Sequence, residues 1–378
     1  MTEELAGGDL SRLRQLNAAA VLRELRGDQP LTLTELSKRT RLSRASTEDV
    51  ARDLLGRGWL TELAPALGSV GRPARRYRFN AEAGRILGVD IGGHKVLALV
   101  TDLDGQVLHQ SRITVDPGLG RRERLAVLDK CVTKALADVE AGHIWSTGVA
   151  TTGLVDGTGK VLLSDSLPEW TGVDLAAHVR RLVPGPVRVE NDCKLAALAE
   201  SWRGVARYAK DVVFLLAGLR TGAGLIIDGK LHRGFANWSG EIGALPAAGW
   251  LRAPEHLHSW IARSGRPEAS DEFESVFFAA RSGDRDAVRA VRGYVRDLAV
   301  GASALVLTLD PELVVIGGGF SRSADVMVEP LRRELDRWCL RTPEIRVSAF
   351  ADEGVALGAV RLALDEVEST ITTGLGRG

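Results

Sequence analysis

One stretch, residues 86–105 (ILGVDIGGHKVLALVTDLDG), constrains the fold most. Apolar residues run up to Asp90, a glycine pair follows at 92 and 93, a second apolar run covers 96–100, and 102–105 supply turn residues. This pattern predicts a β-hairpin with a glycine-rich tip, then a turn into another strand. Glycines let backbone N–H groups approach an anion closely, and an aspartate at a strand end can hold a metal or a hydroxyl. The chain before this hairpin differs in pattern from the chain after it.

Length and charge limit the classes of protein to consider. The chain has 378 residues, enough for two or three domains with their own cores. Its 49 basic and 49 acidic residues cancel, so no net charge draws the whole molecule to nucleic acid or membrane. The segment 71–78 nevertheless holds four arginines (Arg72, Arg75, Arg76 and Arg78) and no acid. A local basic element on a neutral body is typical of a DNA-binding head attached to a regulatory body.

The cysteines and the first residues indicate the compartment. Cys131, Cys193 and Cys339 lie far apart and show no metal-binding or redox spacing, so we interpret them as thiols in a reducing compartment. The start, MTEELAGGDL, lacks the features of a signal peptide, and no apolar stretch is long enough to span a membrane. We therefore expect a soluble, cytoplasmic protein with no membrane partner.

Residues 1–80 have the pattern of a winged helix-turn-helix domain. Apolar positions such as Leu13, Leu16, Val21 and Leu25 recur at helical spacing in 11–27, and a second short helix is predicted at 33–40. Ser43 can cap a third helix. Two short helices joined by a tight turn are typical of helix-turn-helix DNA binding. Segments 59–62 and 75–79 read as two short strands around a loop, which forms the wing.

The expected DNA contacts come from the third helix and the wing. We predict that Ser43, Arg44 and Thr47 read or touch the major groove. The loop sequence Gly-Arg-Pro at 71–73 resembles the core of an AT-hook, a flat unit that fits a narrow minor groove. Arg72, Arg75 and Arg76 would therefore grip the minor groove or phosphates. The alternative is a small helical domain for protein contact, with the arginines as a solvated face.

The body beyond residue 105 alternates strands and helices. Strands are predicted at 107–114, 146–150 and 187–189, with helices at 124–141 and 193–203. Polar residues follow two of these strands, at 151–153 and 190–192. Open α/β sheets bind ligands at such carboxyl strand ends.

The second half of the body begins with the same pattern of strand, glycine-rich turn and strand, which predicts a related lobe. A strand at 211–216, a glycine-rich turn at 218–224 and a strand at 225–227 echo the first hairpin. A buried strand at 312–319, a helix at 324–337, a strand at 345–349 and a helix at 358–366 follow. Pro330 is expected to kink or shorten the helix that contains it.

Four ordered motifs carry a resemblance to a known family. They are GVDIGG at 88–93, END at 190–192, GEIG at 240–243 and VIGGG at 315–319. The chain resembles transcriptional regulators of the ROK family (repressors, open reading frames and sugar kinases) over nearly its full length. The resemblance implies an actin/hexokinase-like (ribonuclease H-like) body over 81–378 that closes on a sugar. One lobe would comprise about 81–195 with the C-terminal helix, and the other about 196–355.

The resemblance also implies roles for individual residues. In the kinases of the family, the residue matching Asp192 is the general base that deprotonates the sugar hydroxyl, and those matching Asn191 and Glu241 hold other hydroxyls. Gly153 is the fourth predicted sugar-site residue. From the residues alone, Asn191 and Asp192 can equally cap the helix that follows them.

Departures from the kinase pattern argue against phosphoryl transfer. His94 follows the first glycine pair, and Leu219 and Arg220 place bulky side chains where phosphate needs bare backbone. Arg220 has an alternative reading, as a ligand for the phosphate of a sugar phosphate. We therefore expect a kinase-like body that is not an enzyme and does not use ATP.

The zinc segment of the family is also altered. Ala244 stands where the family has a zinc-binding histidine, and residues 245–260 contain no cysteine. His256 and His258 lie in this region and suggest either a substitute metal or sugar contact, or ordinary polar residues. We predict no metal and no cofactor.

These observations predict a sugar-responsive transcriptional regulator of carbohydrate-related genes, a repressor rather than an activator. Two heads are needed for two half-sites, so we expect a homodimer or homotetramer on double-stranded operator DNA. Sugar binding would act on the heads through the segment 80–88 as a mechanical joint. The alternatives are an ATP-dependent sugar kinase, and a ROK regulator without a sugar effector that a protein partner controls.

Overall fold

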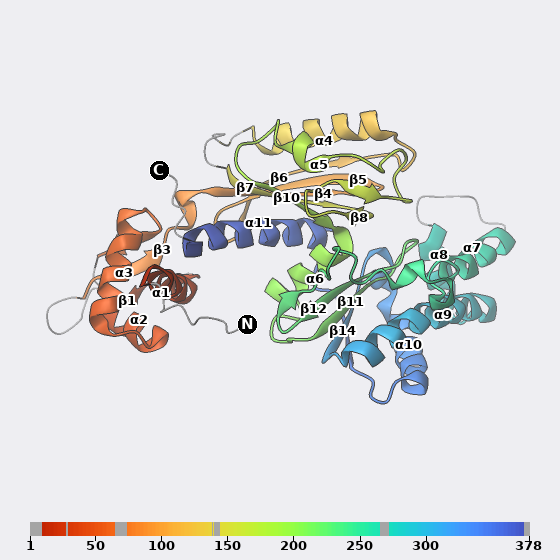
Figure 1. The fold of residues 1–378 in the computed structure, drawn as a ribbon. Helices are drawn as coiled ribbons and strands as arrows, with labels where there is room; N and C mark the ends of the chain where they lie inside the picture. Colours follow the sequence, from red (N-terminus) through yellow and green to blue (C-terminus); the bar gives the residue numbers. More distant parts are fainter. Residues whose placement is uncertain are drawn as a thin grey trace, which may run out of the picture.

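The structure is a computed structural model that describes residues 10–27, 29–64, 74–137, 139, 144–264 and 272–373. The N-terminal part has three helices and a small antiparallel sheet (Figure 1). The helices are α1 (Leu10–Leu25), α2 (Leu33–Thr40) and α3 (Arg44–Gly56). In the sheet, β3 (Arg76–Phe79) lies between β1 (Leu31–Thr32) and β2 (Leu60–Leu63). This is the winged helix-turn-helix arrangement that the sequence predicts.

Local signals in the sequence fix where these helices begin. The Thr32 side chain accepts the backbone N–H of Glu35, and the Glu35 carboxylate accepts the N–H of Thr32, which together form a capping box at α2. The Ser43 side chain caps α3 by accepting the N–H of Ser46. Between the two helices Arg41 adopts a left-handed conformation with φ of 58°, which makes the turn tight.

The first turns of α1 differ from the prediction, because two of their apolar residues do not face the core. Leu13 and Leu16 are 55% and 60% exposed, and the buried residues of this helix are Ala18, Val21, Leu22 and Leu25. The apolar spacing predicts the helix correctly, but its first turns extend beyond the core. Among the described residues, these two side chains therefore remain largely uncovered.

The body contains two five-stranded sheets with the same connectivity. The first has the order β10-β7-β4-β5-β6, and the second β13-β12-β11-β14-β15. In both sheets three antiparallel strands come first in the chain, and two parallel strands are added beside the first of them. The predicted repeat is therefore confirmed as two related lobes. The strands are β4 (Arg85–Ile91), β5 (Lys95–Thr101), β6 (Val107–Thr114), β7 (Ile144–Thr151), β10 (Val187–Asn191), β11 (Val212–Leu216), β12 (Gly222–Ile227), β13 (Lys230–Leu231), β14 (Leu313–Gly317) and β15 (Glu344–Val347).

Two helices fill the space between the sheets. α6 (Asp192–Arg203) packs against β11 and β12 of the second lobe and against α11 (Gly354–Thr373), which in turn covers β4 and β7 of the first lobe. Figure 1 shows α11 running beneath the first sheet, with α6 between the lobes. Because α6 begins where β10 ends, both sheets meet at its N-terminus. The predicted lobe boundary at about 195 therefore falls inside a helix that both lobes contact.

The remaining helices cover the outer faces of the lobes. α4 (Arg121–Ala135) and α5 (Leu175–Val179) belong to the first lobe, and a short pair of strands, β8 (Leu154–Val155) and β9 (Val161–Leu163), lies beside it. The second lobe carries α7 (Ala253–Ser264), α8 (Glu272–Arg281), α9 (Arg285–Leu309) and α10 (Ala324–Trp338). α10 continues through Pro330, so the expected shortening does not occur. Single-turn helices are η1 (Ala81–Ala83), η3 (Ile242–Ala244), η4 (Pro246–Ala248) and η5 (Gly319–Ser323).

The winged helix is packed onto the body. α1 lies against α11, and Leu22 and Leu25 of the head share one hydrophobic core with Val360 and Leu364 of α11. The Trp59 ring meets the Trp145 ring edge-on at 4.9 Å. A continuous core resists hinge motion far more than an exposed linker does. The segment 80–88 is therefore the covalent part of a larger packed joint.

None of the helices among the described residues combines the length and apolar character needed to span a membrane.

Candidate functional site

Three of the four predicted sugar-site residues lie where β7 and β10 end and α6 begins. Asn191 is buried, and its Oδ1 accepts the backbone N–H groups of Cys193 at 2.9 Å and Lys194 at 3.2 Å. Its Nδ2 donates to the Gly153 carbonyl at 3.1 Å. Gly153 has φ of +94°, and a Cβ there would lie 2.2 Å from the Leu163 carbonyl oxygen, so only glycine fits. Asn191 therefore caps α6, the alternative role that its sequence position allows, and also fixes Gly153.

Three carboxyl groups from different elements converge at the first turn of α6. Burial, and then the nearby charge of Asp90, raise the pKa of Asp192 to about 7, and Glu241 contributes in the same direction. Burial also raises the pKa of Asp90, against the attraction of Lys95. Glu241 approaches from a loop of the second lobe. Neighbouring protein atoms exclude water from its carboxyl group and raise its pKa, whereas the positive charge of Lys194 lowers it. The four predicted residues therefore gather around one point between the lobes.

A buried polar cluster behind this point was not predicted. Glu190 and Lys194 are 2% and 1% exposed. Glu190 accepts Nε of Arg233 at 2.8 Å and Nδ2 of Asn237 at 3.0 Å, and Lys194 Nζ lies 3.8 Å from Glu190 and donates to the Asn237 carbonyl. Glu190 and Lys194 belong to β10 and α6, whereas Arg233 and Asn237 belong to the second lobe. The cluster thus ties the loop that carries Glu241 to the start of α6.

The glycine-rich hairpin tips are occupied by basic side chains. Buried Arg124 donates to the Gly92 carbonyl at 2.7 Å. Lys95 Nζ lies 3.4 Å from the Asp90 carboxylate and donates to the Asp352 carbonyl. In the second tip, Arg220 of the second lobe donates to the Asp165 carbonyl of the first lobe at 2.8 Å. The ammonium group of Lys95 therefore places a positive charge beside Asp90, as a bound metal ion would.

The residues in the altered zinc segment do not fit zinc. Ala244 lies in η3, and this segment is held by Trp250, whose indole donates to the Leu298 carbonyl at 3.0 Å. His256 Nε2 pairs with Asp297 at 3.1 Å, and His258 Nδ1 lies 3.0 Å from the Pro254 carbonyl. Across the ranges that the structure describes, no three His, Cys, Asp or Glu side chains are close enough to hold a metal. Apolar packing anchors this segment.

The first turn of α3 presents two of its three predicted DNA contacts to solvent. Ser43 and Arg44 are exposed. Thr47 is fully buried, and its hydroxyl donates to the Ser43 carbonyl at 2.9 Å. The prediction that Thr47 touches the major groove is therefore wrong, because this side chain faces the core with Ala51 and Leu54. Ala51 and Leu54 follow Thr47 by four and seven residues, and this spacing places all three on the inward face.

The wing arginines have different environments. Arg75 is 72% exposed and pairs with Glu62 across the β2–β3 ribbon at 3.2 Å. Arg76 is partly buried and donates to the Pro30 carbonyl at 3.0 Å, so it fastens β3 to the segment before β1. Arg72 lies outside the described residues. Of the two predicted wing contacts that the structure describes, Arg75 is the one directed at solvent.

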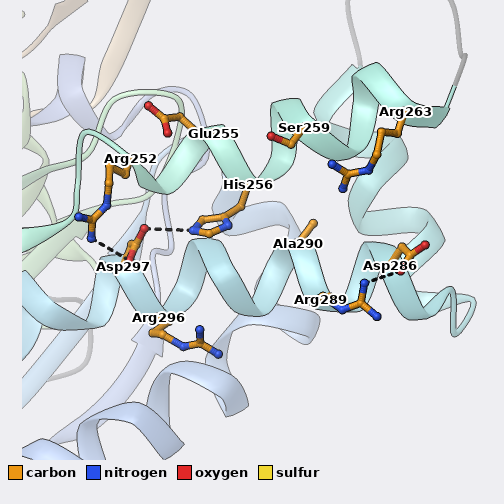
Figure 2. A pocket seen from close by; sticks show the side chains of 10 residues that line it. All are labelled: Arg252, Glu255, His256, Ser259, Arg263, Asp286, Arg289, Ala290, Arg296 and Asp297. Atoms are coloured by element: carbon orange, nitrogen blue, oxygen red, sulfur yellow. Dashed lines mark hydrogen bonds and ion pairs between the residues drawn. The ribbon is translucent and has the colours of Figure 1, made fainter.

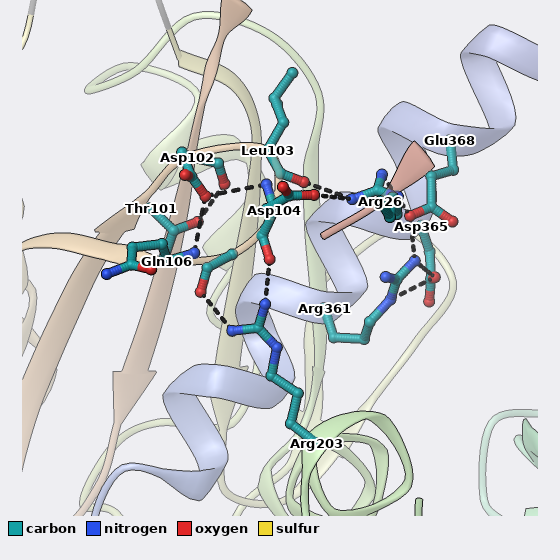
Figure 3. A network of polar contacts seen from close by, with 11 residues as sticks. Arg26, Thr101, Asp102, Leu103, Asp104, Gln106, Arg203, Arg361, Asp365 and Glu368 are labelled. Atoms are coloured by element: carbon teal, nitrogen blue, oxygen red, sulfur yellow. Dashed lines mark hydrogen bonds and ion pairs between the residues drawn. The ribbon is translucent and has the colours of Figure 1, made fainter. Parts of the chain in front are cut away.

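A polar network joins the head to the far end of α6 (Figure 3). Arg26, after α1, donates to the Leu103 carbonyl at 2.6 Å and pairs with Glu368 of α11 at 2.8 Å. Arg203, the last residue of α6, donates to the Gly105 carbonyl at 2.9 Å and to the Asp104 carbonyl. The turn at 103–105 therefore contacts the head on one side and α6 on the other. The same helix carries Asp192 at its other end.

Comparison with known proteins agrees with this architecture. The ROK family model matches residues 86–366. The xylose repressor of Caldicellulosiruptor bescii is 25% identical over 96% of this chain and 98% of its own length, and the glucokinase of Thermotoga maritima is 25% identical over 75% of this chain and 98% of its own.

Solved structures show the same fold. A ROK family transcriptional regulator, a homologue of the E. coli MLC protein, superposes with a TM-score of 0.77 at 21% identity, over 96% of this chain and 98% of that one. A ROK family glucokinase from Streptomyces griseus, in complex with glucose and AMPPNP, gives a TM-score of 0.64 at 24% identity, over 75% of this chain and 100% of that one. With a family model that spans most of its length and a body of matching topology, the chain belongs to the ROK family.

Proposed function

We propose that this protein is a DNA-binding transcriptional repressor of carbohydrate-related genes, and that a sugar or sugar derivative bound between its lobes is the effector. One observation carries the proposal. The glucokinase relatives cover 75% of this chain, whereas the xylose repressor and the ROK regulator cover 96%. The family model begins at residue 86, just after the last strand of the winged helix. The head is thus what this chain shares with repressors.

The carboxylates of Asp192 and Glu241 are the groups we assign to sugar hydroxyls. Ionised carboxylates are strong acceptors for paired hydroxyl groups. The Asn191 amide is already committed to Cys193, Lys194 and Gly153, so we assign it a positioning role. It holds the first turn of α6, and with it Asp192, in place.

We assign no phosphotransfer activity to the body. A kinase needs bare backbone and positive charge around the γ-phosphate, and a base for the sugar hydroxyl. Asp192 matches that base, but Lys95 sits on Asp90, and Arg220 contacts Asp165 beside the bulky Leu219. A coupled assay with ATP and the effector sugar is expected to show no turnover.

On the DNA side we assign Ser43 and Arg44 to the major groove, and Arg75 with Arg72 to the minor groove or phosphates. One head covers one half-site, so we propose a homodimer or homotetramer acting on operator DNA in the cytoplasm. Light scattering is expected to give a mass of two or four chains.

The test couples sugar binding to DNA release. DNA fragments retained by the full-length protein identify the operator, and calorimetry with xylose, glucose, N-acetylglucosamine and their phosphates identifies the effector. We expect one sugar to bind and to weaken operator binding, and Asp192→Ala to lose both effects. The matched control, Asp336→Ala, changes an exposed carboxylate on α10. Operator binding without heat from any sugar would contradict the sugar-effector proposal and favour control by a protein partner.

A further inference from the structure

Two helices of the second lobe carry matching polar stripes. On α7 and the residue before it, the stripe is Arg252, His256, Ser259 and Arg263; on α9 it is Arg285, Arg289, Arg292 and Arg296. Both have the spacing i, i+4, i+7 and i+11, which keeps side chains on one face of a helix. The two helices pack against each other. The stripes line two adjoining hollows, the first of about 540 Å³ (Figure 2).

Positive charge dominates this α7–α9 groove. Six arginines face three acids, which are Glu255, Asp286 and Asp297. Asp297 pairs with Arg252 at 3.3 Å, and Asp286 pairs with Arg289 at 2.7 Å. Within the described part of the chain, no ion pair joins a carboxylate to the other four arginines, which are Arg263, Arg285, Arg292 and Arg296. The groove therefore has guanidinium groups left over for a ligand.

The floor of the groove is rigidly built. The His256 ring lies directly over Gly293, where an added Cβ would be 2.6 Å from Nδ1, and it pairs with Asp297 at 3.1 Å. Beneath the stripes, Leu257 and Tyr294 belong to the core of the lobe. The arginine side chains thus project from helices whose separation is fixed by close packing.

The distribution of charge selects the class of ligand. Guanidinium groups bind phosphate with two parallel hydrogen bonds. The stripe on α9 extends about 16 Å along the helix, at 1.5 Å per residue, so one phosphate group cannot satisfy it. A protein partner would need exposed apolar anchors, but Leu257 and Trp260 are turned into the core. DNA held by α3 is remote, because the groove lies at the opposite end of the molecule (Figure 1).

We propose that the α7–α9 groove binds a small molecule carrying two or more phosphate groups. This site is separate from the sugar site at Asp192. A ligand bound there would be a second effector, and an anionic one.

The probe is inorganic tripolyphosphate, titrated into the full-length protein by calorimetry at constant ionic strength. We expect tripolyphosphate to bind at least tenfold more tightly than inorganic phosphate, and the double variant Arg292→Gln/Arg296→Gln to lose at least tenfold of that affinity. The matched control is Arg332→Gln/Arg333→Gln on α10, which should bind as the wild type does. Operator binding should be unchanged in both variants, which shows that they are folded.

Three outcomes would overturn the proposal. They are no binding of tripolyphosphate, equal binding by wild type and the α9 variant, and tighter binding of polyglutamate than of tripolyphosphate with the same dependence on Arg292 and Arg296. The last outcome would assign the groove to an acidic protein segment.

Discussion

Asp192 holds a proton near neutral pH because burial and the charge of Asp90 raise its pKa to about 7. Between about pH 4 and pH 7 the folded protein keeps this proton while the unfolded chain has lost it. The free energy of unfolding should therefore fall as pH rises through this window, and the contribution should be constant above it. A sugar that needs the ionised carboxylate should show the opposite trend in affinity.

We predict that sugar affinity rises about tenfold between pH 6 and pH 8, since the ionised fraction of a group with a pKa of about 7 rises about tenfold over that range. Calorimetry across this pH range measures it. In Asp192→Asn the affinity should be low and independent of pH. A pH-independent affinity in the wild type would show that Asp192 does not accept from the ligand.

Arg44 and Thr47 should respond differently to substitution. Arg44→Ala should weaken operator binding and reduce its salt dependence, because an exposed charge is lost at the start of α3. Thr47→Val should leave operator affinity unchanged and lower the free energy of unfolding by about 1 kcal/mol, through loss of the hydrogen bond to Ser43. Fluorescence anisotropy and urea unfolding separate the two effects. A loss of operator affinity in Thr47→Val would reverse the assignment.

The sequence does not predict the role of a polar side chain correctly where that side chain is buried and bonded to other protein groups. Ser43 and Thr47 are alike in the sequence, and only the packing of α3 shows that Thr47 points inward. Lys194 is a similar case, because a lysine among alanines and leucines on a helix indicates an unusual environment but does not name its partners. Those partners, Asn237 and Glu190, come from two lobes.

At the scale of elements, α6 connects the proposed effector site to the head. Asp192 starts this helix, and Arg203 ends it on the turn at 103–105, which Arg26 of the head also contacts. We predict that Arg203→Met leaves sugar affinity within about twofold of wild type but at least halves the sugar-induced loss of operator binding, because two contacts to the turn disappear. Titrating sugar against operator complexes measures this coupling.

The matched control for Arg203 is Arg207→Met, since Arg207 is exposed and, among the contacts that the structure describes, its side chain meets only the Tyr208 ring. It should release DNA as the wild type does. Unchanged release in Arg203→Met would show that the signal reaches the head by another route, such as α11.

The hairpins and their strands were predictable, because alternating apolar runs with glycine turns leave few other folds. The helices α7 to α9 were not predicted. Apolar residues do recur at helical spacing along α7 and α9, although several of the inward positions are glycine or alanine. The structure shows why they are small: a side chain at Gly293 would meet His256, and one at Gly301 would meet Trp250. The helical spacing of the apolar residues in α7 and α9 could nevertheless have identified these two helices.

For the whole molecule, the shared core makes the head and the first lobe one folding unit. We predict that Leu25→Ala lowers the free energy of unfolding by about 2–5 kcal/mol, and that head and lobe still unfold in one transition. Calorimetry and the near-ultraviolet circular dichroism of Trp59 and Trp145 should report the same midpoint. Leu16→Ala, at an exposed position of the same helix, should change stability by less than about 0.5 kcal/mol. An early separate transition of the head would contradict the shared core.

The common strand order of the two sheets points to an origin by internal duplication. The tip after β4 and the tip after β11 are then counterparts. One has kept glycines beside Asp90, and the other has acquired Leu219 and Arg220. Divergence between the two related halves thus gives their hairpin tips different side chains. The first half supplies Asp90, and the second half supplies Glu241 and the Arg220 side chain that donates to Asp165.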